Sequence, residues 1–322
     1  MPMRVPSFLK DPLIQGILVA TVLAVLLPAR GTFAEVVDVA TTVAIALLFF
    51  LYGARLSTRE AVRGLTHWKL HLLILGCTFL VYPLVGLALR PTTAFISDPL
   101  YQGILYAMLV PSTVQSSVAL TGIARGNVSG AVVAASLSSM VGVVVTPLLV
   151  MLLMGAGEGI HVDATVFLNI GLQLLLPFVL GQIAHNVVPR AGEVAGAKAT
   201  KLVDRGSIWM VVYAAFSQGV VSGVWSEVRV WEILLLVAVA FLLVYAMLWL
   251  TKAVSNALRF SYEDRVAIQM CGTQKSLAAG LPMASVIFGG AALGILIVPL
   301  MLYHLVQLII CSATAARYAR EA

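Results

Sequence analysis

Long apolar runs alternate with short polar segments along the whole chain. A helix needs about 20 predominantly apolar residues to cross a hydrocarbon core that is roughly 30 Å thick. The pattern therefore predicts an all-α integral membrane protein with ten transmembrane helices and short loops. The predicted spans are 12–28, 36–54, 70–90, 99–124, 128–154, 163–187, 205–224, 230–251, 265–289 and 293–315.

The composition agrees with this pattern. Hydrophobic residues make up 61% of the chain and charged residues 11%, and the mean hydropathy is +1.01, far from the values of soluble domains. The net charge of +6 could indicate a nucleic-acid partner, but the cations do not gather into one basic face. We expect the lipid bilayer as the surroundings and no nucleic acid as a partner.

The cations are distributed unequally between alternate loops. Of the twenty Lys and Arg residues, Arg30, Arg90 and Arg229 fall in one set of loops and Lys275 falls inside a span, which leaves sixteen in the other set. By the positive-inside rule, both termini are predicted to be cytoplasmic, in the inner or plasma membrane of the cell. The first apolar run resembles a signal peptide, but the many spans after it favour a retained helix.

Motifs of soluble enzymes are missing from the sequence. There is no H-E-x-x-H, G-x-S-x-G or Walker A motif and no pair of carboxylates within the spans, so we expect no enzyme and no ATP-driven pump. Cys77, Cys271 and Cys311 lie in apolar runs without a C-x-x-C pair, so we expect free thiols, no structural metal and no cofactor.

The chain contains an internal repeat. Residues 115–119 read QSSVA and residues 274–278 read QKSLA, and the next span of each copy contains VTPL or IVPL. An odd number of spans separates the copies, so the second copy runs in the opposite direction through the membrane. The sequence predicts one transporter domain over 1–322, built as a 5+5 inverted repeat with halves near 1–157 and 158–322.

Both copies carry helix breakers around a polar run, from Pro111 to Gly122 and from Gly272 to Gly280 and Pro282. Unwound backbone is tolerated at membrane depth only where protein or water satisfies it, and the half-helix ends then present partial charges to a ligand. The predicted binding site is the crossing of these spans. Its candidate polar residues are Ser112, Thr113, Gln115, Ser116, Ser117, Thr273, Gln274, Lys275 and Ser276.

Two readings of this polar set are open. The hydroxyl groups could bind a ligand, or they could simply form hydrogen bonds between neighbouring helices. Lys275 is different, because a cation at mid-span costs about 2.5–3.5 kcal/mol on insertion scales and no acidic residue lies near mid-span. Its amine is held by carbonyl and side-chain oxygens, or is neutral because burial disfavours the charge, or binds an anion.

His304 is the histidine predicted to lie at mid-span, between Tyr303 and Gln307. An imidazole changes its charge near neutral pH, which would suit a proton relay. A structural hydrogen-bonding role is the alternative.

Several runs resemble one transporter family. They are 67–72 (HWKLHL), 124–127 (ARGN), 273–277 (TQKSL), 280–283 (GLPM), 298–300 (VPL) and 303–304 (YH). Together they resemble the bile acid:sodium symporter superfamily, in particular the branch typified by solute carrier family 10 member 7. The resemblance implies a panel domain and a core domain, with discontinuous, crossed helices four and nine.

The resemblance also implies sodium ligands, and most of them are replaced in this chain. The Ser-Asn pair of helix four falls on Ser116 and Ser117, and the helix-nine Gln falls on Gln274. The helix-five Ser and Thr fall on Ala131 and Ala135, and the helix-nine Glu falls on Met270. Two intact sodium sites cannot be built from this set, which suggests that Lys275 replaces a bound cation.

The sequence therefore predicts a secondary transporter that moves a small organic anion by alternating access. The coupling ion, Na⁺ or H⁺, is left open, although the altered sites favour sodium-independent or proton-linked transport. A non-transporting regulator of calcium homeostasis is the alternative that the resemblance also allows, and a channel is a third possibility.

Overall fold

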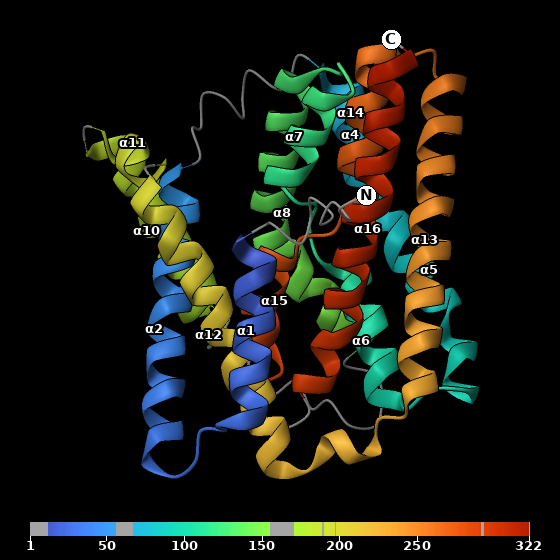
Figure 1. The fold of residues 1–322 in the computed structure, drawn as a ribbon. Coiled ribbons are helices and arrows are strands. Elements are labelled where there is room, and N and C mark those ends of the chain that lie inside the picture. The colour runs from blue at the N-terminus through green and yellow to red at the C-terminus, as the bar shows by residue number, and fades with distance from the viewer. Residues whose placement is uncertain are drawn as a thin grey trace, which may run out of the picture. The chain divides into compact units, whose positions relative to one another are not determined.

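The computed structural model describes residues 12–55, 67–154, 171–188, 190–196, 198–290 and 293–321, and this part of the chain contains helices and no strand (Figure 1). The all-α class is therefore confirmed. The elements in chain order are α1 (Pro12–Leu26), α2 (Thr32–Arg55), α4 (Trp68–Gly76), the π-helical turn η3 (Cys77–Val81), α5 (Tyr82–Ala88), η4 (Arg90–Ala94), α6 (Asp98–Leu109), α7 (Gln115–Ile123), α8 (Val128–Met154), the π-helical turn η5 (Gly171–Leu175), α10 (Leu176–Val187), α11 (Ala191–Gly196), α12 (Lys198–Ser222), η6 (Val224–Glu227), α13 (Val230–Ala257), α14 (Tyr262–Thr273), α15 (Leu277–Ile287) and α16 (Leu293–Glu321).

The predicted spans coincide with these helices, but several helices are longer than the spans. The helix α12 begins at Lys198 and α16 ends at Glu321, both beyond the ends of the predicted spans. The spans are shorter because hydropathy detects the apolar part of a helix and not its polar ends. Residues 163–170 of the sixth predicted span and the boundary between the predicted halves, at 157 and 158, lie outside the described residues.

Among the described residues, five helical segments are long and apolar enough to cross a membrane, and two shorter apolar helices, 12–26 and 171–187, accompany them. The five are Thr32–Arg55, Trp68–Ala94, Val128–Met154, Val230–Ala257 and Leu293–Glu321. These segments fit an integral membrane protein, whereas the number of ten spans stays a prediction.

The chain divides into two compact units. Unit 1 comprises Met1–Leu56, Val162–Val228 and Leu281–Ile297, and unit 2 comprises Ser57–His161, Arg229–Gly280 and Val298–Ala322. Each unit takes segments from both predicted sequence halves. The predicted site residues all fall in unit 2.

In unit 1, α2 packs closely against α10 through two glycines. A Cβ atom at Gly53 would lie 2.0 Å from the carbonyl oxygen of Phe178, and a Cβ atom at Gly181 would lie 2.1 Å from that of Phe50. Such distances leave no room for any side chain. The absence of a Cβ atom is therefore what allows the two backbones to approach one another.

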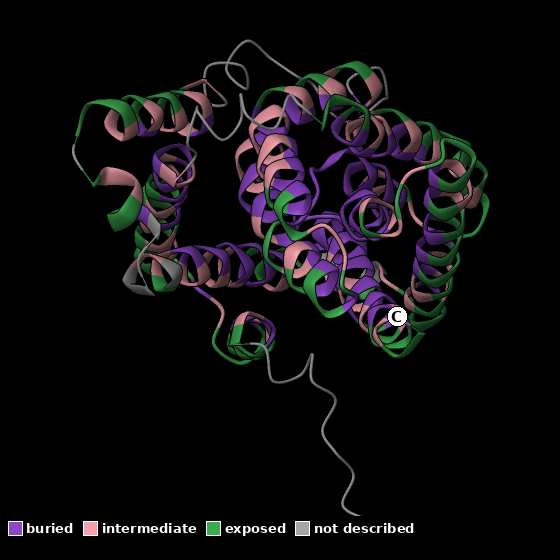
Figure 2. Ribbon diagram, turned by 90° about the horizontal axis from the view of Figure 1, so that it is seen from above, coloured by how far each residue is buried: buried purple, intermediate pink, exposed green. Residues whose placement is uncertain are grey.

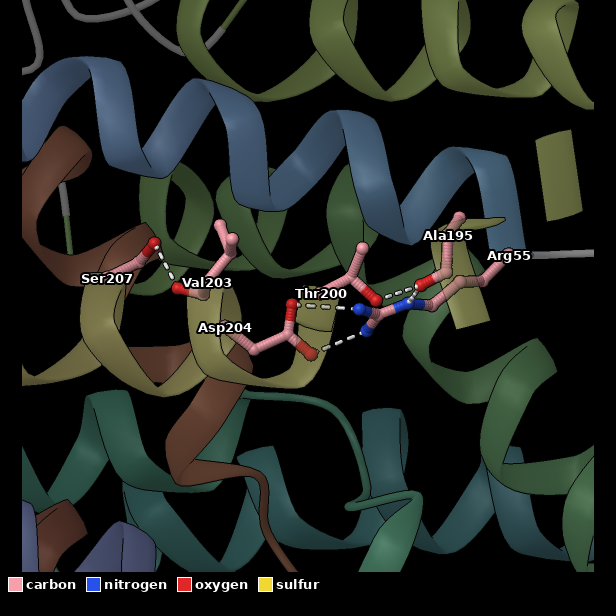
Figure 3. A network of polar contacts seen from close by, with 6 residues as sticks. All are labelled: Arg55, Ala195, Thr200, Val203, Asp204 and Ser207. Atoms are coloured by element: carbon pink, nitrogen blue, oxygen red, sulfur yellow. Dashed lines mark hydrogen bonds and ion pairs between the residues drawn. The ribbon is translucent and has the colours of Figure 1, made fainter. Parts of the chain in front are cut away.

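A polar network joins the end of α2 to α12 (Figure 3). The Arg55 guanidinium donates from Nη1 and Nη2 to the two carboxylate oxygens of Asp204, at 2.6 and 3.1 Å. Its Nε donates to the carbonyl oxygen of Ala195 at 2.5 Å, and the Thr200 hydroxyl donates to the same oxygen. This bidentate pair is mostly shielded from solvent, since the Asp204 side chain is 10% exposed.

We expect Asp204→Asn and Arg55→Met each to lower the melting temperature of the purified protein. Each change leaves one shielded charge without its partner, at a cost on the order of 1–3 kcal/mol after allowance for partial exposure. The double variant should lose less than the sum of the two single variants, since it removes both charges. A fluorescence melting curve measures the effect.

The exposed ion pair of unit 1 is the matched control for that prediction. Arg190 and Glu193 lie 4.0 Å apart with side chains 82% and 79% exposed, so Glu193→Gln should change the melting temperature little. Equal losses for Glu193→Gln and Asp204→Asn would contradict the role given to the Arg55 pair.

Unit 2 surrounds α14 with α4, α7, α8 and α13, and its buried residues lie toward the inside while exposed ones lie on the outer helix faces (Figure 2). An apolar cluster fills the space between α4, α8 and α14. Its buried members are Leu70, Ile74, Ala131, Ala134, Ala135, Ala267, Ile268 and Cys271. Small alanines on α8 let α14 approach closely, which fixes the position of the end of α14.

The start of α14 is also fixed. The Asn127 backbone N–H donates to the carbonyl oxygen of Glu263 at 2.9 Å, and its side chain donates to the Asp264 carboxylate at 2.7 Å. The Ser261 hydroxyl caps the helix by accepting from the backbone N–H of Asp264. The turn between α7 and α8 is thus joined to α14.

Candidate functional site

Two helix interruptions contact one another inside unit 2. The first separates α6 from α7 at residues 110–114, and the second separates α14 from α15 at residues 274–276. The backbone N–H of Ser276 in the second donates to the carbonyl oxygen of Pro111 in the first at 2.8 Å. Both predicted breaks are present, and the chain brings them together.

The first break follows from proline chemistry. Pro111 has no N–H to continue α6, and it disfavours helical backbone at Val110, which adopts φ −75° and ψ 155°. The last carbonyl groups of α6 are consequently left without helical partners. The Thr146 hydroxyl donates to one of them, the carbonyl of Leu109, at 2.9 Å.

The second break lies within the predicted region, but not at the predicted helix breakers. Gly272 belongs to α14, and both Gly280 and Pro282 belong to α15, so none of the expected helix breakers lies in the interruption itself. The unwound residues are Gln274 to Ser276. Hydrogen bonds from other helices hold this backbone open, so tertiary contacts and not local propensity make the break.

Lys275 lies in this second break, and its side chain is fully buried. Its Nζ donates to the carbonyl oxygens of Met108 and Val110, both at 2.8 Å, and of Thr78 at 3.0 Å. Nζ also lies 4.2 Å from the centre of the Tyr82 ring. Three carbonyl acceptors match the three N–H groups of an ammonium ion, whereas a neutral amine has two.

The carbonyl of Thr78 is free for Lys275 because of the π-helical turn η3. The backbone N–H of Tyr82 donates to the carbonyl of Cys77, and the next residue, Pro83, has no N–H. The carbonyl of Thr78 therefore lacks a local donor, and the ammonium takes this place. Of the three readings of Lys275, this geometry favours a cation held by carbonyl oxygens, with no N–H left for an anion.

Two tyrosines bind the end of α14. The carbonyl oxygen of Thr273 lies 2.5 Å from the hydroxyl of Tyr82 and 3.0 Å from that of Tyr303, and the two hydroxyls lie 2.6 Å apart. Serines of the first break bind further carbonyls of α14. Ser112 donates to Cys271 at 2.6 Å, and Ser117 donates to Met270 at 3.3 Å.

The helix α7 begins with a polar cluster that is not fully paired. The Ser116 hydroxyl donates to Oε1 of Gln274 at 2.5 Å and lies 2.9 Å from the hydroxyl of Thr113. Gln274 is 1% exposed, yet among the described residues its Nε2 has no hydrogen-bond partner, and neither does Oγ1 of Thr273. This is an unusual arrangement, since buried polar atoms are nearly always paired.

The N-terminus of α7 also lacks a cap. Val114 stands at the N-cap and makes no side-chain hydrogen bond, and Val114 and Gln115 are exposed. By contrast, the Ser276 hydroxyl caps α15 by accepting from the backbone N–H of Ala279 at 3.1 Å. The N–H groups in the first turn of α7, which have no helical acceptors, and the Nε2 of Gln274 are donors suited to an anionic oxygen.

Gln307 and His304 on α16 bind the peptide of Lys275. The Lys275 backbone N–H donates to Oε1 of Gln307 at 2.7 Å, and Nε2 of Gln307 donates back to the carbonyl of Lys275 at 2.8 Å. Nδ1 of His304 lies 2.8 Å from Nε2 of Gln307. His304 therefore contacts the second break rather than the unpaired cluster at α7.

The predicted set is thus brought together, with different roles for its members. Thr113, Ser116 and Gln274 form the incompletely paired cluster, and Gln115 is exposed at its edge. The side chains of the remaining members have structural partners, described above for Ser117, Lys275, Ser276 and His304. Thr273 contributes its backbone carbonyl to such a contact, whereas its Oγ1 is unpaired among the described residues.

Sequence reasoning missed Tyr82, Thr78, Ser138 and Thr146. Ser138 accepts from the backbone N–H of Ser112 at 3.0 Å. The signal for two of them was a proline inside an apolar run, in Tyr82-Pro83 and Thr146-Pro147. Neither hydroxyl binds the carbonyl that its neighbouring proline frees. Tyr82 donates to the carbonyl of Thr273 and Thr146 to that of Leu109, so both residues join separate helices.

The two positions to which the resemblance assigns the helix-five sodium ligands are apolar in space as well as in sequence. Ala131 and Ala135 are both fully buried members of the apolar cluster of unit 2. Among the described residues, no group of three or more His, Cys, Asp or Glu side chains could hold a metal ion. The three cysteines, Cys77, Cys271 and Cys311, are free and buried.

Comparison with known proteins gives a consistent result. The model of the SBF-like CPA transporter family matches residues 11–320. An uncharacterized protein of Pseudomonas aeruginosa, PA2026, is 46% identical over 320 residues, which cover 98% of this chain and 95% of that protein. The putative symporter YfeH of Escherichia coli is 39% identical over 97% of this chain and 93% of its own. Sodium/bile acid cotransporter 7 of Xenopus tropicalis is 29% identical over 84% of this chain and 80% of its own.

Proposed function

Since the chain belongs to the SBF-like CPA transporter family, we propose that it is a secondary carrier of a small organic anion that works by alternating access. One observation carries the proposal. Beside the uncapped start of α7, the buried Nε2 of Gln274 has no partner among the described residues. A carboxylate, sulfonate or sulfate oxygen would satisfy both this donor and the helix N-terminus.

The cation that balances such an anion is supplied by the protein. Lys275 places a fixed ammonium among three backbone carbonyls, which are the kind of oxygen ligands that hard cations prefer. Alanines in an apolar cluster stand where the family's helix-five ligands would be. We therefore propose that transport does not require sodium and that a proton serves as the coupling ion.

The proposed architecture follows the same family. Unit 1 would be the panel domain and unit 2 the core domain, and ten spans in two inverted halves would place both termini in the cytoplasm of the cell. The two interruptions in unit 2 support this assignment, since broken helices are typical of carriers with inverted repeats.

A ligand-stability screen tests the proposal directly. We expect cholate to raise the melting temperature of the purified protein equally in sodium and potassium chloride, and the uncharged methyl ester of cholate to have no effect. Benzoate and methyl benzoate form a second pair for a smaller site. Gln274→Leu should remove the stabilisation by the anions, whereas Asn186→Ala, on an exposed face of α10, should preserve it.

Flux separates a carrier from a regulator. Liposomes containing the protein should take up the stabilising anion with saturation, and uptake should fall in Gln274→Leu. Binding without any flux would favour a non-transporting regulator. Equal stabilisation by an anion and its ester, or stabilisation that needs sodium, would contradict the proposed site.

A further inference from the structure

The side chain of Gln307 has a fixed orientation, although amide oxygen and nitrogen are hard to tell apart by shape. A backbone N–H can only donate, so the atom that lies 2.7 Å from the Lys275 N–H must be the amide oxygen. The amide nitrogen then faces the carbonyl of Lys275 at 2.8 Å. We call these two hydrogen bonds the Gln307 clamp.

The Gln307 clamp determines the protonation state of His304. Nδ1 of His304 lies 2.8 Å from the amide nitrogen of Gln307, which can only donate. Nδ1 must therefore accept, and the ring carries its proton on Nε2 and is neutral. In this state the contact between Nδ1 and the carbonyl oxygen of Lys275, at 3.3 Å, joins two acceptors.

We propose that His304 is a proton-binding site and that its protonation opens the Gln307 clamp. A proton on Nδ1 would place two N–H donors 2.8 Å apart, and this contact between the imidazolium and the amide is repulsive. The new N–H would face the carbonyl of Lys275, which already lies 3.3 Å away. His304 then replaces Gln307 as the donor to this carbonyl.

The exchange of donors changes the second break. Once Gln307 turns away, the backbone N–H of Lys275 loses the acceptor that it has in the neutral state. A buried N–H without an acceptor is costly, so the residues between α14 and α15 must rearrange. Binding of one proton from water at Nδ1 thereby moves the segment that carries Gln274.

Other titratable groups around His304 do not prevent this exchange. Titratable groups in this part of unit 2 include Lys275, whose carbonyl His304 contacts, and the hydroxyls of Tyr82 and Tyr303 with the thiols of Cys77 and Cys311, which surround Tyr82. The ammonium opposes a second positive charge, but its charge is balanced by three carbonyl oxygens and the Tyr82 ring. Of His304 and these groups, the imidazole is the one whose unperturbed titration lies near pH 6.5.

The inference rests on the proposed function only in taking the bound proton as the coupling ion. The Gln307 clamp and its opening are properties of the protein without a substrate. Two of the three measurements below therefore need no transported anion.

The first measurement is the tautomer of His304, by ¹⁵N NMR of the full chain with labelled histidines in nanodiscs. His185 is an internal control, since its Nδ1 lies 2.7 Å from the carbonyl of Ala54 and must donate. At high pH we expect the Nε2–H form for His304 and the Nδ1–H form for His185, assigned with His304→Asn and His185→Asn. A Nδ1–H form of His304 at high pH would overturn the proposal.

The second measurement is hydrogen exchange at the Lys275 amide, corrected for the intrinsic effect of pH. Between about pH 8 and about pH 5 we expect protection to fall roughly threefold to tenfold, the worth of one buried hydrogen bond. In His304→Asn, whose Oδ1 can accept in place of Nδ1 but cannot bind the proton, protection should persist at both pH values. In Gln307→Ala, the Lys275 amide should lack this protection at both pH values. Protection that is independent of pH, or a loss that persists in His304→Asn, would overturn the opening of the clamp.

The third measurement is flux of the stabilising anion, with cholate as the first probe, under an imposed pH gradient. The gradient should accelerate uptake by the wild type and not by His304→Asn. Uptake that responds equally in both would overturn coupling through His304 while the carrier function stands. Opening of the clamp in a protein without flux would contradict the carrier function and support the proton site.

Discussion

Replacing Lys275 with alanine is expected to abolish uptake of the stabilising anion and to lower the melting temperature. The change removes the donor from three buried carbonyl oxygens, those of Thr78, Met108 and Val110. Each unsatisfied acceptor costs on the order of 1–3 kcal/mol unless water or an ion replaces the amine. The fixed positive charge that we propose to balance the anion is lost as well. Liposome uptake and melting curves measure the two effects.

Sodium provides a sharper test of the same residue. If the ammonium replaces a bound cation, the carbonyl cluster of Lys275→Ala should gain affinity for sodium, and sodium chloride should raise its melting temperature more than choline chloride does. The wild type should show no such preference. Lys69→Ala removes an exposed amine on α4 and is the matched control. Wild-type uptake by Lys275→Ala would remove this residue from the mechanism.

Substitution of Gly181 or Gly53 by valine is expected to prevent correct folding of unit 1. A Cβ atom at either position would lie only 2.1 or 2.0 Å from a backbone oxygen of the facing helix, far inside van der Waals contact. Backbone atoms cannot move aside as a side-chain end can, so α2 and α10 must separate along their contact. We expect a loss of monodisperse protein in size-exclusion chromatography and a large fall in melting temperature.

A third glycine of unit 1 is the control for this prediction. A Cβ atom at Gly206 on α12 would meet no heavy atom within 4 Å. Gly206→Ala should therefore leave folding intact, and Gly206→Val should be tolerated far better than Gly181→Val. Similar behaviour of the two valine variants would show that helix propensity, and not the close approach, controls the outcome.

The helices themselves were predictable because the membrane imposes a simple rule on the sequence. Apolar runs of sufficient length predict helices, and the structure has helices in these places, including α8 and α13. The helix ends were less predictable. The polar residues from Lys198 onward continue α12 although no hydropathy signal marks them, since a helical backbone does not end where the lipid ends.

The site was predictable to the extent that it depends on backbone chemistry. Pro111 predicts the first break, because it lacks an N–H and restricts the residue before it. The second break was placed in the correct region on the wrong grounds. It depends on Gln307 and Tyr303, which lie some 30 residues further along the chain, and no local pattern reveals such contacts.

The role of Lys275 shows the same limit. Its position in an apolar run indicated that the charge needs compensation, and the sequence left three explanations open. The choice among them required the carbonyl of Thr78, which is freed by Pro83 in a distant helix. Long-range pairing of one freed oxygen with one ammonium is visible only in three dimensions.

The hydrogen bond between Ser276 and Pro111 constrains how a carrier of this kind can work. Further bonds from Ser112 to Cys271 and from Ser116 to Gln274 join the same two interruptions. We therefore expect the two broken helices to move together, since a transport cycle that first separated them would have to break all these bonds. A covalent crosslink between α7 and α14 should therefore leave turnover intact, since only the unwound residues 274–276 would have to change their local hydrogen bonds.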